Sequence, residues 1–344
     1  MANYTNKLEK LKNRRQDIIT KAFSLNENFN KKTYGESTTY ALEAMEEISA
    51  EYTNNTYKQV MRVQNHLKPG LNEYGIDVDF RYQGSVPTNT HIKLYSDIDL
   101  LAIHQKFYTL EPPLRPTYPY LGDTLADLKE LRSRAFRILD TVFTSCDIDD
   151  SGGKALTISG GSLNRKIDII SSNWHNTVRY QNSNDEVYRG VKILDRDNNK
   201  EILNFPFMHI HCINQKDIEV GGNEKRVIRL LKSIKADADE NINVSSYDIA
   251  SLVYRMDNSY LHTSRNQRIV LINNTNQFLT KVINDKTFRE SLYVANGTRR
   301  LFCNDGTRLE EVVKLQKEVE ALVFEIAKEL KPLNESIEKS IVYY

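Results

Sequence analysis

The stretch Ser96-Asp97-Ile98-Asp99-Leu100, with Gly84-Ser85 ahead of it, decides how this sequence is interpreted. Alternating polar and apolar residues over 97–103 predict a strand, so the side chains of Asp97 and Asp99 should point to the same face. Like charges on one face repel, and hard carboxylate oxygens are ligands that suit Mg²⁺. A glycine at the end of the preceding strand lets a phosphate approach the backbone, where N–H groups and the Ser85 hydroxyl can hold it.

A third carboxylate, Asp168 in Arg165-Lys-Ile-Asp-Ile-Ile170, lies within another predicted strand. A buried aspartate without a partner would be costly there, so we expect it to face a ligand or a metal ion. Three carboxylates suit a two-metal site, in which one ion activates an attacking hydroxyl and the other holds the leaving oxygens. Asp-x-Asp alone is most often an exposed strand face or a turn. Gly-Ser upstream and a strand aspartate downstream make the combination fairly specific.

Around these residues the sequence divides into a helical start, a mixed block and a helical end. Residues 1–68 carry helical apolar stripes, with Ser37 or Thr38 as the expected N-cap of the second helix. The mixed block contains a predicted helix at 125–142 and a hairpin that turns at Gly160-Gly161. Its predicted strands cover residues 78–82, 97–103, 155–159, 166–171, 188–194 and 203–210. We therefore expect an α+β protein, with N-terminal helices and a sheet domain at 1–213 and a helical domain at 214–344.

Composition excludes several classes of protein. The chain has 344 residues, 40% of them hydrophobic, and a formal net charge of +1, so a whole basic surface for nucleic acid is not expected. No apolar run is long enough to span a membrane, and the polar N-terminus does not resemble a secretory signal. Three scattered cysteines are too few for a disulfide framework. We expect a cytoplasmic protein that does not bind membranes.

Two further motifs are each an incomplete match to a known type of binding site. His209-Ile-His211-Cys212 would place ligands on one face of a strand, but the chain lacks the Cys-x-x-Cys that usually completes a zinc site. Gly152-Gly153-Lys154 is similar to the end of a phosphate-binding P-loop, but the first glycine and the Ser/Thr after the lysine are absent. Neither motif supports a function.

The acidic residues, with Gly84-Ser85, resemble the signature of the polymerase-β-like nucleotidyltransferases. The C-terminal half narrows the resemblance to the cGAS/DncV-like nucleotidyltransferases, which are related to oligoadenylate synthetase. The segments that carry it are Asn214–Val220, Gly221-Gly222, Lys225–Lys232, Ser245–Ile249 and Ala295–Phe302. The resemblance covers about residues 37–330. It implies a polymerase-β-like palm and a C-terminal helical lobe, with the active site in the cleft between them.

The resemblance also implies residue roles. Asp97, Asp99 and Asp168 would bind two Mg²⁺ ions, with Mn²⁺ as an alternative metal, and Asp168 would help to deprotonate a ribose hydroxyl. Gly84 and Ser85 would contact the donor phosphates, Lys232 and Ser246 the triphosphate tail, and Tyr247 a base. A triphosphate carries about four negative charges, so two Mg²⁺ ions and a lysine bring the site close to neutrality.

The family's activity would be the synthesis of a cyclic di- or trinucleotide from triphosphates such as ATP and GTP. The product would be a second messenger in bacterial antiphage (CBASS) signalling and would activate a separate effector protein. A regulatory partner is compatible with this scheme.

Other interpretations remain open. The chain could be a template-free transferase acting on RNA or protein, or a non-catalytic nucleotide or RNA sensor of the same fold. Taken singly, Lys232 would be read as a solvated helix face, Ser245-Ser246 as an N-cap and Tyr247 as core packing.

Overall fold

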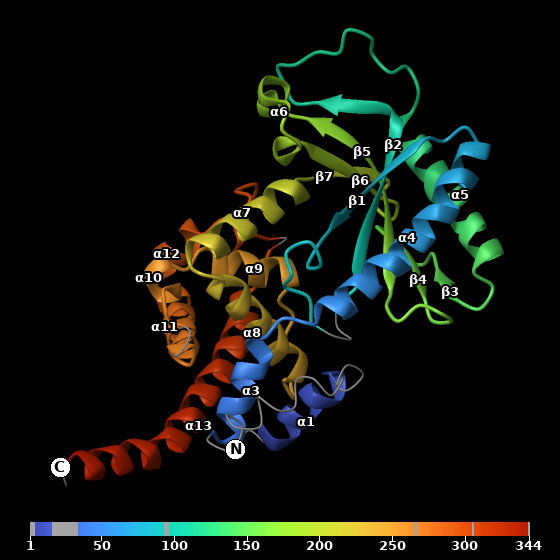
Figure 1. The fold of residues 1–344 in the computed structure, drawn as a ribbon. Helices are drawn as coiled ribbons and strands as arrows, with labels where there is room; N and C mark the ends of the chain where they lie inside the picture. The colour runs from blue at the N-terminus through green and yellow to red at the C-terminus, as the bar shows by residue number, and fades with distance from the viewer. Residues whose placement is uncertain (1–3, 16–33, 93–95, 265–266, 305, 343–344) are drawn as a thin grey trace. The chain divides into compact units, whose positions relative to one another are not determined.

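The computed structural model describes residues 4–15, 34–92, 96–264, 267–304 and 306–342, without the side chains of residues 15 and 332–342. The chain forms two compact units (Figure 1). The sheet unit contains Ser49–Thr88 and Ser96–Cys212, and the helical unit contains Met1–Ile48, Asn89–Tyr95 and Ile213–Tyr344. The expected α+β class is thereby confirmed.

The sheet unit is built on one mixed sheet, in which seven strands lie within the described residues. The strands are β1 Val78–Gln83, β2 Ile98–Leu110, β3 Asp147–Asp149, β4 Leu156–Ser159, β5 Ile167–Asn176, β6 Gly190–Asp195 and β7 Lys200–Asn204. Their order is β1-β2-β5-β4-β3, and β6 pairs with both β5 and β7. β2 and β5 are parallel, and the other pairs are antiparallel. The predicted hairpin is confirmed as β4 and β5.

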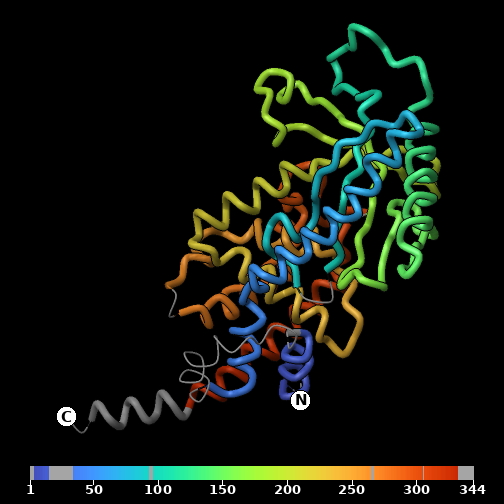
Figure 2. Tube along the Cα trace, turned by 45° about the vertical axis from the view of Figure 1, so that its right-hand side comes forward, coloured from blue at the N-terminus to red at the C-terminus, as the bar shows by residue number. Residues whose placement is uncertain are grey.

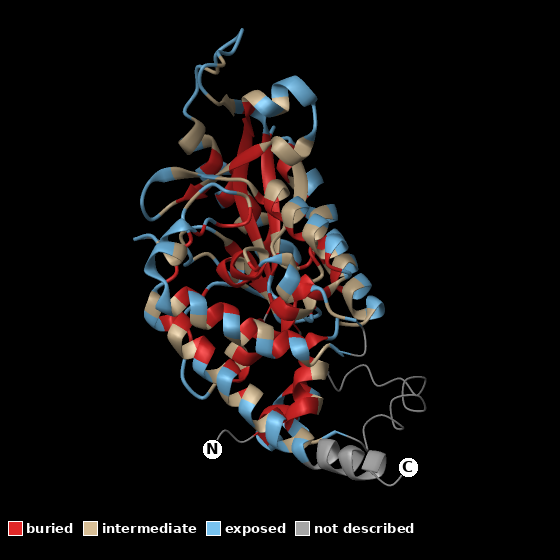
Figure 3. Ribbon diagram, turned by 90° about the vertical axis from the view of Figure 1, so that its left-hand side faces the viewer, coloured by how far each residue is buried: buried red, intermediate tan, exposed pale blue. Residues whose placement is uncertain are grey.

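One face of this sheet is covered by helices α4 Ala50–Glu73 and α5 Thr124–Val142. Ser49 and Asp123 cap the two helices by accepting hydrogen bonds from backbone N–H groups in their first turns. The core between helices and sheet is apolar, and the central strand β5 is buried along almost its whole length (Figure 3). It includes Val60, Val63, Leu67, Ile98, Leu100, Leu128, Leu131, Leu139, Leu156, Ile158, Ile167 and Ile169. Each large side chain buried there stabilises the fold by about 1.5–3 kcal/mol.

The rest of the described chain is mainly helical. The sheet unit also carries α6 Val178–Ser183, and α7 Pro206–Glu219 runs from it into the helical unit. The helical unit contains α1 Tyr4–Arg15, α3 Glu36–Met45, α8 Asn223–Asp237, α9 Ser246–Tyr254, α10 Asn258–Leu261, α11 Val270–Asn284, α12 Lys286–Ser291 and α13 Leu309–Val342. None of the helices in the described ranges is long and apolar enough to cross a lipid bilayer.

Two local predictions for these helices are wrong. Residues 205–210 are not strand, because α7 begins at Pro206, a residue well suited to the first turn of a helix. α3 has Gly35 as its N-cap rather than Ser37 or Thr38. The carboxylate of Glu329, from α13, instead accepts hydrogen bonds from the Ser37 and Thr38 N–H groups at 2.8 and 2.9 Å.

The first 48 residues group with the C-terminal helices rather than with the sheet. α3 lies beside α1, α8 and α13 (Figure 2). Asp237 on α8 accepts hydrogen bonds from Arg14 on α1 and from the Tyr40 hydroxyl on α3, the latter at 3.0 Å. The last boundary between the units, at Cys212/Ile213, lies next to the 213/214 boundary expected from sequence.

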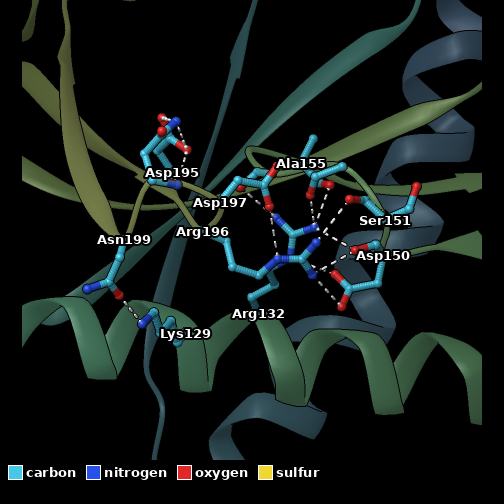
Figure 4. Close-up of polar contacts among 12 residues, drawn as sticks. Lys129, Arg132, Asp150, Ser151, Ala155, Asp195, Arg196, Asp197 and Asn199 are labelled. Carbon is cyan, nitrogen blue, oxygen red and sulfur yellow. Dashed lines mark hydrogen bonds and ion pairs between the residues drawn. The ribbon is translucent and has the colours of Figure 1, made fainter.

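The loop between β3 and β4 is organised around the guanidinium of Arg132, a buried residue of α5 (Figure 4). Its nitrogens donate to the Asp150 side chain and to the backbone carbonyls of Asp150, Gly152, Gly153 and Ala155. A phosphate-binding loop points its backbone N–H groups toward the phosphate. The loop between β3 and β4 instead points its carbonyl oxygens toward the Arg132 guanidinium. The geometry agrees with the sequence argument against a P-loop at Gly152-Gly153-Lys154.

Replacing Arg132 with alanine should lower the free energy of unfolding of the sheet unit by about 3 kcal/mol. The substitution leaves the carbonyls of Gly152 and Ala155 without this donor and removes one of the two arginines that pair with the Asp150 carboxylate, the other being Arg196. Urea denaturation followed by circular dichroism measures the change. Arg134→Ala is the matched control on the same helix, because Arg134 pairs with Glu130 one turn away and should cost about 1 kcal/mol or less. Equal losses in the two variants would contradict the role given to Arg132.

Candidate functional site

A row of polar residues crosses the sheet in direct register on the face opposite the main core. Gln83 of β1 pairs with Asp99 of β2, and Asp99 pairs with Asp168 of β5. Asp168 pairs in turn with Thr157 of β4, and Thr157 with Asp149 of β3. On β2, β4 and β5 the neighbours of these residues along the strand are buried in the apolar core. Because side chains alternate along a strand, burying those neighbours turns the polar row to the other face.

Asp97 comes directly before β2 and lies two residues from Asp99, so it shares that face. It is exposed, whereas Asp99 and Asp168 are half-buried. Although the residue as a whole is exposed, its carboxylate is partly desolvated, which raises the pKa of Asp97 above its ordinary value. The charge of Asp168 raises this pKa further. The positive charges of Lys166 and Arg165 lower the pKa of Asp97. Asp97 and Asp168 are therefore close enough to repel each other, and a cation placed between them would relieve that repulsion.

The carboxylate of Asp168 is held by a neighbour. The Thr157 hydroxyl donates a hydrogen bond to Oδ1 of Asp168 at 2.6 Å. No group of three or more His, Cys, Asp or Glu side chains within the described ranges is already gathered as a metal cluster. The donor set nevertheless fits hard divalent cations, since three carboxylates share one face and two of them are in register.

Gly84 follows β1 and lies against Asp99. Its φ angle is 77°, a left-handed conformation that favours glycine, and a Cβ atom built there would overlap Oδ2 of Asp99. Ser85 is the next residue of the same turn, and its carbonyl accepts a hydrogen bond from the Thr88 hydroxyl at 3.1 Å. The structure thus brings Gly84, Ser85 and the three aspartates together in the sheet unit.

The other three predicted residues belong to the helical unit. Lys232 of α8 is buried, with 4% of its surface exposed, and its ammonium donates to the carbonyl of Thr90 at 2.9 Å. Interpreting it as a solvated helix face is therefore wrong. Ser245 is the N-cap of α9, since it accepts a hydrogen bond from the Asp248 N–H at 3.0 Å. Ser246 is the first residue of that helix and is exposed.

Tyr247 is half-buried beside the loop at residues 295–302. The Arg299 guanidinium lies 5.7 Å from the centre of the tyrosine ring and also forms an ion pair with Asp248. Burial raises the pKa of the Tyr247 hydroxyl, while Arg299 and hydrogen bonds with Thr298 and Asn296 lower it. The tyrosine is not simply a core residue, because its ring and hydroxyl both contact polar groups.

The sequence did not identify three residues next to the carboxylates. Thr157 could have been found only from the register of the β4–β5 hairpin. Lys166 and Arg165 precede Asp168 in the segment at residues 165–170, but the sequence pattern assigns them no role. Arg165 is 6% exposed and donates to the Tyr52 hydroxyl at 3.1 Å and to the Ser96 carbonyl at 3.4 Å, so it anchors the residue before Asp97.

The His209-Ile-His211-Cys212 motif does not form a metal site in the described residues. These residues lie on a helix, α7, where positions two apart point in different directions. Burial lowers the pKa of His209 to about 4, as expected of a neutral histidine packed in the interior.

Comparison with known proteins agrees with this geometry. Residues 211–323 match the family model of the cGAS/DncV-like nucleotidyltransferase C-terminal helical domain. A curated relative from Yersinia aleksiciae, named cyclic dinucleotide synthase CdnE, is 34% identical over 333 residues, which cover 94% of this chain and 87% of the relative. A relative from Capnocytophaga granulosa, named c-di-GMP synthase, is 33% identical over 343 residues, covering 91% of this chain and 94% of the relative.

Solved structures show the same fold. A structure described as a STING-associated CdnE c-di-GMP synthase from Capnocytophaga granulosa matches with a TM-score of 0.78 and 31% identity, covering 95% of this chain and 99% of that one. A second such synthase, from Flavobacteriaceae sp., has a TM-score of 0.79 at 24% identity, with the same coverage of both chains. Identity above 30% over nearly the whole length, together with the matching fold, shows that this chain belongs to the cGAS/DncV-like nucleotidyltransferases and is a nucleotidyltransferase.

Proposed function

We propose that this enzyme joins two nucleoside triphosphates into a cyclic dinucleotide and releases two molecules of pyrophosphate. The observation that carries the proposal is the set of three aspartates on one sheet face, with Gly84 packed against Asp99. The names of the Yersinia and Capnocytophaga relatives support a cyclic dinucleotide product. The word c-di-GMP in the second name makes GTP the first substrate to test.

The proposed site uses two Mg²⁺ ions, or Mn²⁺ in their place, held by Asp97, Asp99 and Asp168. When bound, the ions would lower the pKa of the attacking hydroxyl and neutralise the phosphate charge. The metal assignment is supported by the donor set and by the repulsion between Asp97 and Asp168.

The chain's own groups position and deprotonate the reactants. In each of the two steps a ribose hydroxyl oxygen forms a bond to an α-phosphorus, and the bond from that phosphorus to the β-phosphate oxygen breaks. Asp168 accepts the hydroxyl proton, and pyrophosphate leaves with the bonding electrons. The Ser85 hydroxyl and the Gly84 backbone contact the donor phosphates, and such positioning supplies most of the catalysis in phosphoryl-type transfer.

The helical unit carries the residues proposed to contact a triphosphate tail and a base. Ser246 stands exposed at the N-terminus of α9, where backbone N–H groups favour a phosphate. Lys232, whose ammonium donates to the Thr90 carbonyl, would add a positive charge for the triphosphate tail from within the helical unit. The ring of Tyr247 offers a stacking surface for a base, and the loop that carries Arg299 supports the ring from outside α9.

The product would act as a second messenger in antiphage (CBASS) signalling, made in the cytoplasm and recognised by a separate effector protein. The description of the Capnocytophaga structure as STING-associated supports an effector of this kind. A regulatory partner that controls synthesis is compatible with the proposal.

The decisive experiment is a product assay with purified protein, Mg²⁺ and all four nucleoside triphosphates, one of them carrying an α-³²P label at a time. A phosphatase-resistant product that requires GTP is expected, and nuclease P1 digestion reports its linkage. The variant Asp97→Asn with Asp99→Asn should form no product, yet its thermal unfolding midpoint should not fall, because the substitution removes repelling charges.

Other outcomes of this assay would overturn the proposal. Release of pyrophosphate with only linear or macromolecular products would indicate a transferase acting on RNA or protein. Neither product nor pyrophosphate, with phage-infected cell extract added as a source of activators, would indicate a nucleotide sensor. Product formation by the doubly substituted variant would refute the metal ligands.

The substitution Gly84→Ala should reduce the rate of pyrophosphate release by about 100-fold, because the new methyl group displaces the Asp99 carboxylate. Gly75→Ala is the matched control. Gly75 has a similar φ of 72° but no atom within 4 Å of its would-be Cβ. Both variants should lose about 1–2 kcal/mol of stability, and only Gly84→Ala should lose activity. Equal activity in the two would argue against the contact with Asp99.

Tyr247→Ala should raise the KM for nucleotide by a factor that corresponds to about 1–3 kcal/mol of lost base stacking. Tyr247→Phe keeps the ring and should stay close to the wild-type value. Initial rates measured over a range of GTP concentrations separate KM from kcat. If the alanine variant has an unchanged KM, Tyr247 does not stack on a base.

A further inference from the structure

The contact between Thr157 and Asp168 has no role in the scheme above. The two residues stand opposite each other in the antiparallel β4–β5 pair, and the threonine hydroxyl donates to Oδ1 of Asp168 at 2.6 Å. A hydrogen bond from a hydroxyl to a carboxylate at this distance is short and charge-assisted, which places it among the stronger hydrogen bonds in proteins.

The position of Thr157 is fixed from both sides. Its strand neighbours, Leu156 and Ile158, are 1% and 0% exposed, so the side chain between them must lie on the carboxylate face. The strand begins directly after the loop that Arg132 holds through the Ala155 carbonyl, at 2.8 Å. Threonine is also β-branched, and such side chains have restricted χ1 angles. The Thr157 hydroxyl therefore has a restricted orientation.

We propose that Thr157 is a positioning residue for Asp168, holding this carboxylate in the orientation that the metal ions and the substrate hydroxyl require. The inference rests on the proposed function, because it assigns Thr157 a task at that same site. A carboxylate that accepts at Oδ1 cannot turn about its Cβ–Cγ bond without losing the hydrogen bond. Residues that orient a metal ligand in this way commonly affect metal affinity or activity by about 10–100-fold when substituted.

Three variants separate the hydroxyl from the shape of the side chain. Thr157→Val keeps the shape and removes the hydroxyl. Thr157→Ser keeps the hydroxyl and removes only a methyl group. Ser159→Ala is the control on the same strand and face, since Ser159 pairs with Asp147 and not with the aspartates of the site. Thermal unfolding of each variant verifies that it is folded.

The first measurement is Mn²⁺ binding followed by the electron paramagnetic resonance signal of the free ion, with and without α,β-methylene-GTP. Thr157→Val should weaken binding by about 10–100-fold, whereas Thr157→Ser and Ser159→Ala should stay within about threefold of wild type. In the Asp168→Asn background, Thr157→Val should have no further effect, because the group that it orients is gone. The second measurement is turnover, where Thr157→Val should lower kcat and raise the Mg²⁺ concentration for half-maximal rate, with the KM for GTP unchanged.

The outcomes distinguish this inference from the proposed function. If Asp168→Asn loses Mn²⁺ binding and product while Thr157→Val behaves as wild type, the metal site stands and the role of Thr157 is refuted. If Thr157→Ser is as impaired as Thr157→Val, the side chain acts through packing, and the inference is again wrong. If wild type binds no Mn²⁺, or if Asp168→Asn binds it as wild type does, the metal assignment fails and this inference fails with it.

Discussion

The parallel pairing of β2 with β5 places Asp99 directly beside Asp168, and the sheet unit is organised around this approach of two like charges. The register is held by the opposite face, where Ile98 and Ile167 are fully buried in the main core. A slip of one residue would turn Asp168 into that core and expose the isoleucines. The apolar pattern therefore determines where the charges lie, although the charges themselves oppose the arrangement.

Several neighbours make this concentration of charge tolerable. Lys166 and Arg165 lower the pKa of Asp97, and the Thr157 hydroxyl satisfies one oxygen of Asp168. Gly84 leaves room for the Asp99 carboxylate, because any side chain at position 84 would occupy the same space. Electrostatic repulsion nevertheless remains between Asp97 and Asp168 in the folded chain. A divalent cation bound as proposed would remove this repulsion.

The sequence alone could predict those features that depend on local pattern. The three aspartates, the β4–β5 hairpin and the helical C-terminal half follow from alternation and periodicity. Features that depend on distant partners could not be predicted in this way. Glu329 replaces a local N-cap on α3 from almost 300 residues away. Thr157 gains its partner only from strand register. Lys232, on a helix rich in charge, is buried, and its ammonium there donates to the carbonyl of Thr90. Pro206 could have been recognised as a helix start, but the apolar residues around it resembled a strand.

The segment at residues 89–95 joins the Gly84-Ser85 turn to Asp97, yet it belongs to the helical unit. Its described residues Thr90, His91 and Ile92 are buried there, and Arg229 holds the carbonyl of Asn89 at 2.7 Å. The chain therefore passes between the units four times, at residues 48/49, 88/89, 95/96 and 212/213. Neither unit is one continuous stretch of sequence. A fragment of residues 49–212 would contain the segment at 89–95 but lack the helices of the unit to which that segment belongs. An insertion or deletion at residues 89–92 would therefore alter the helical unit and also the connection that leads to Asp97.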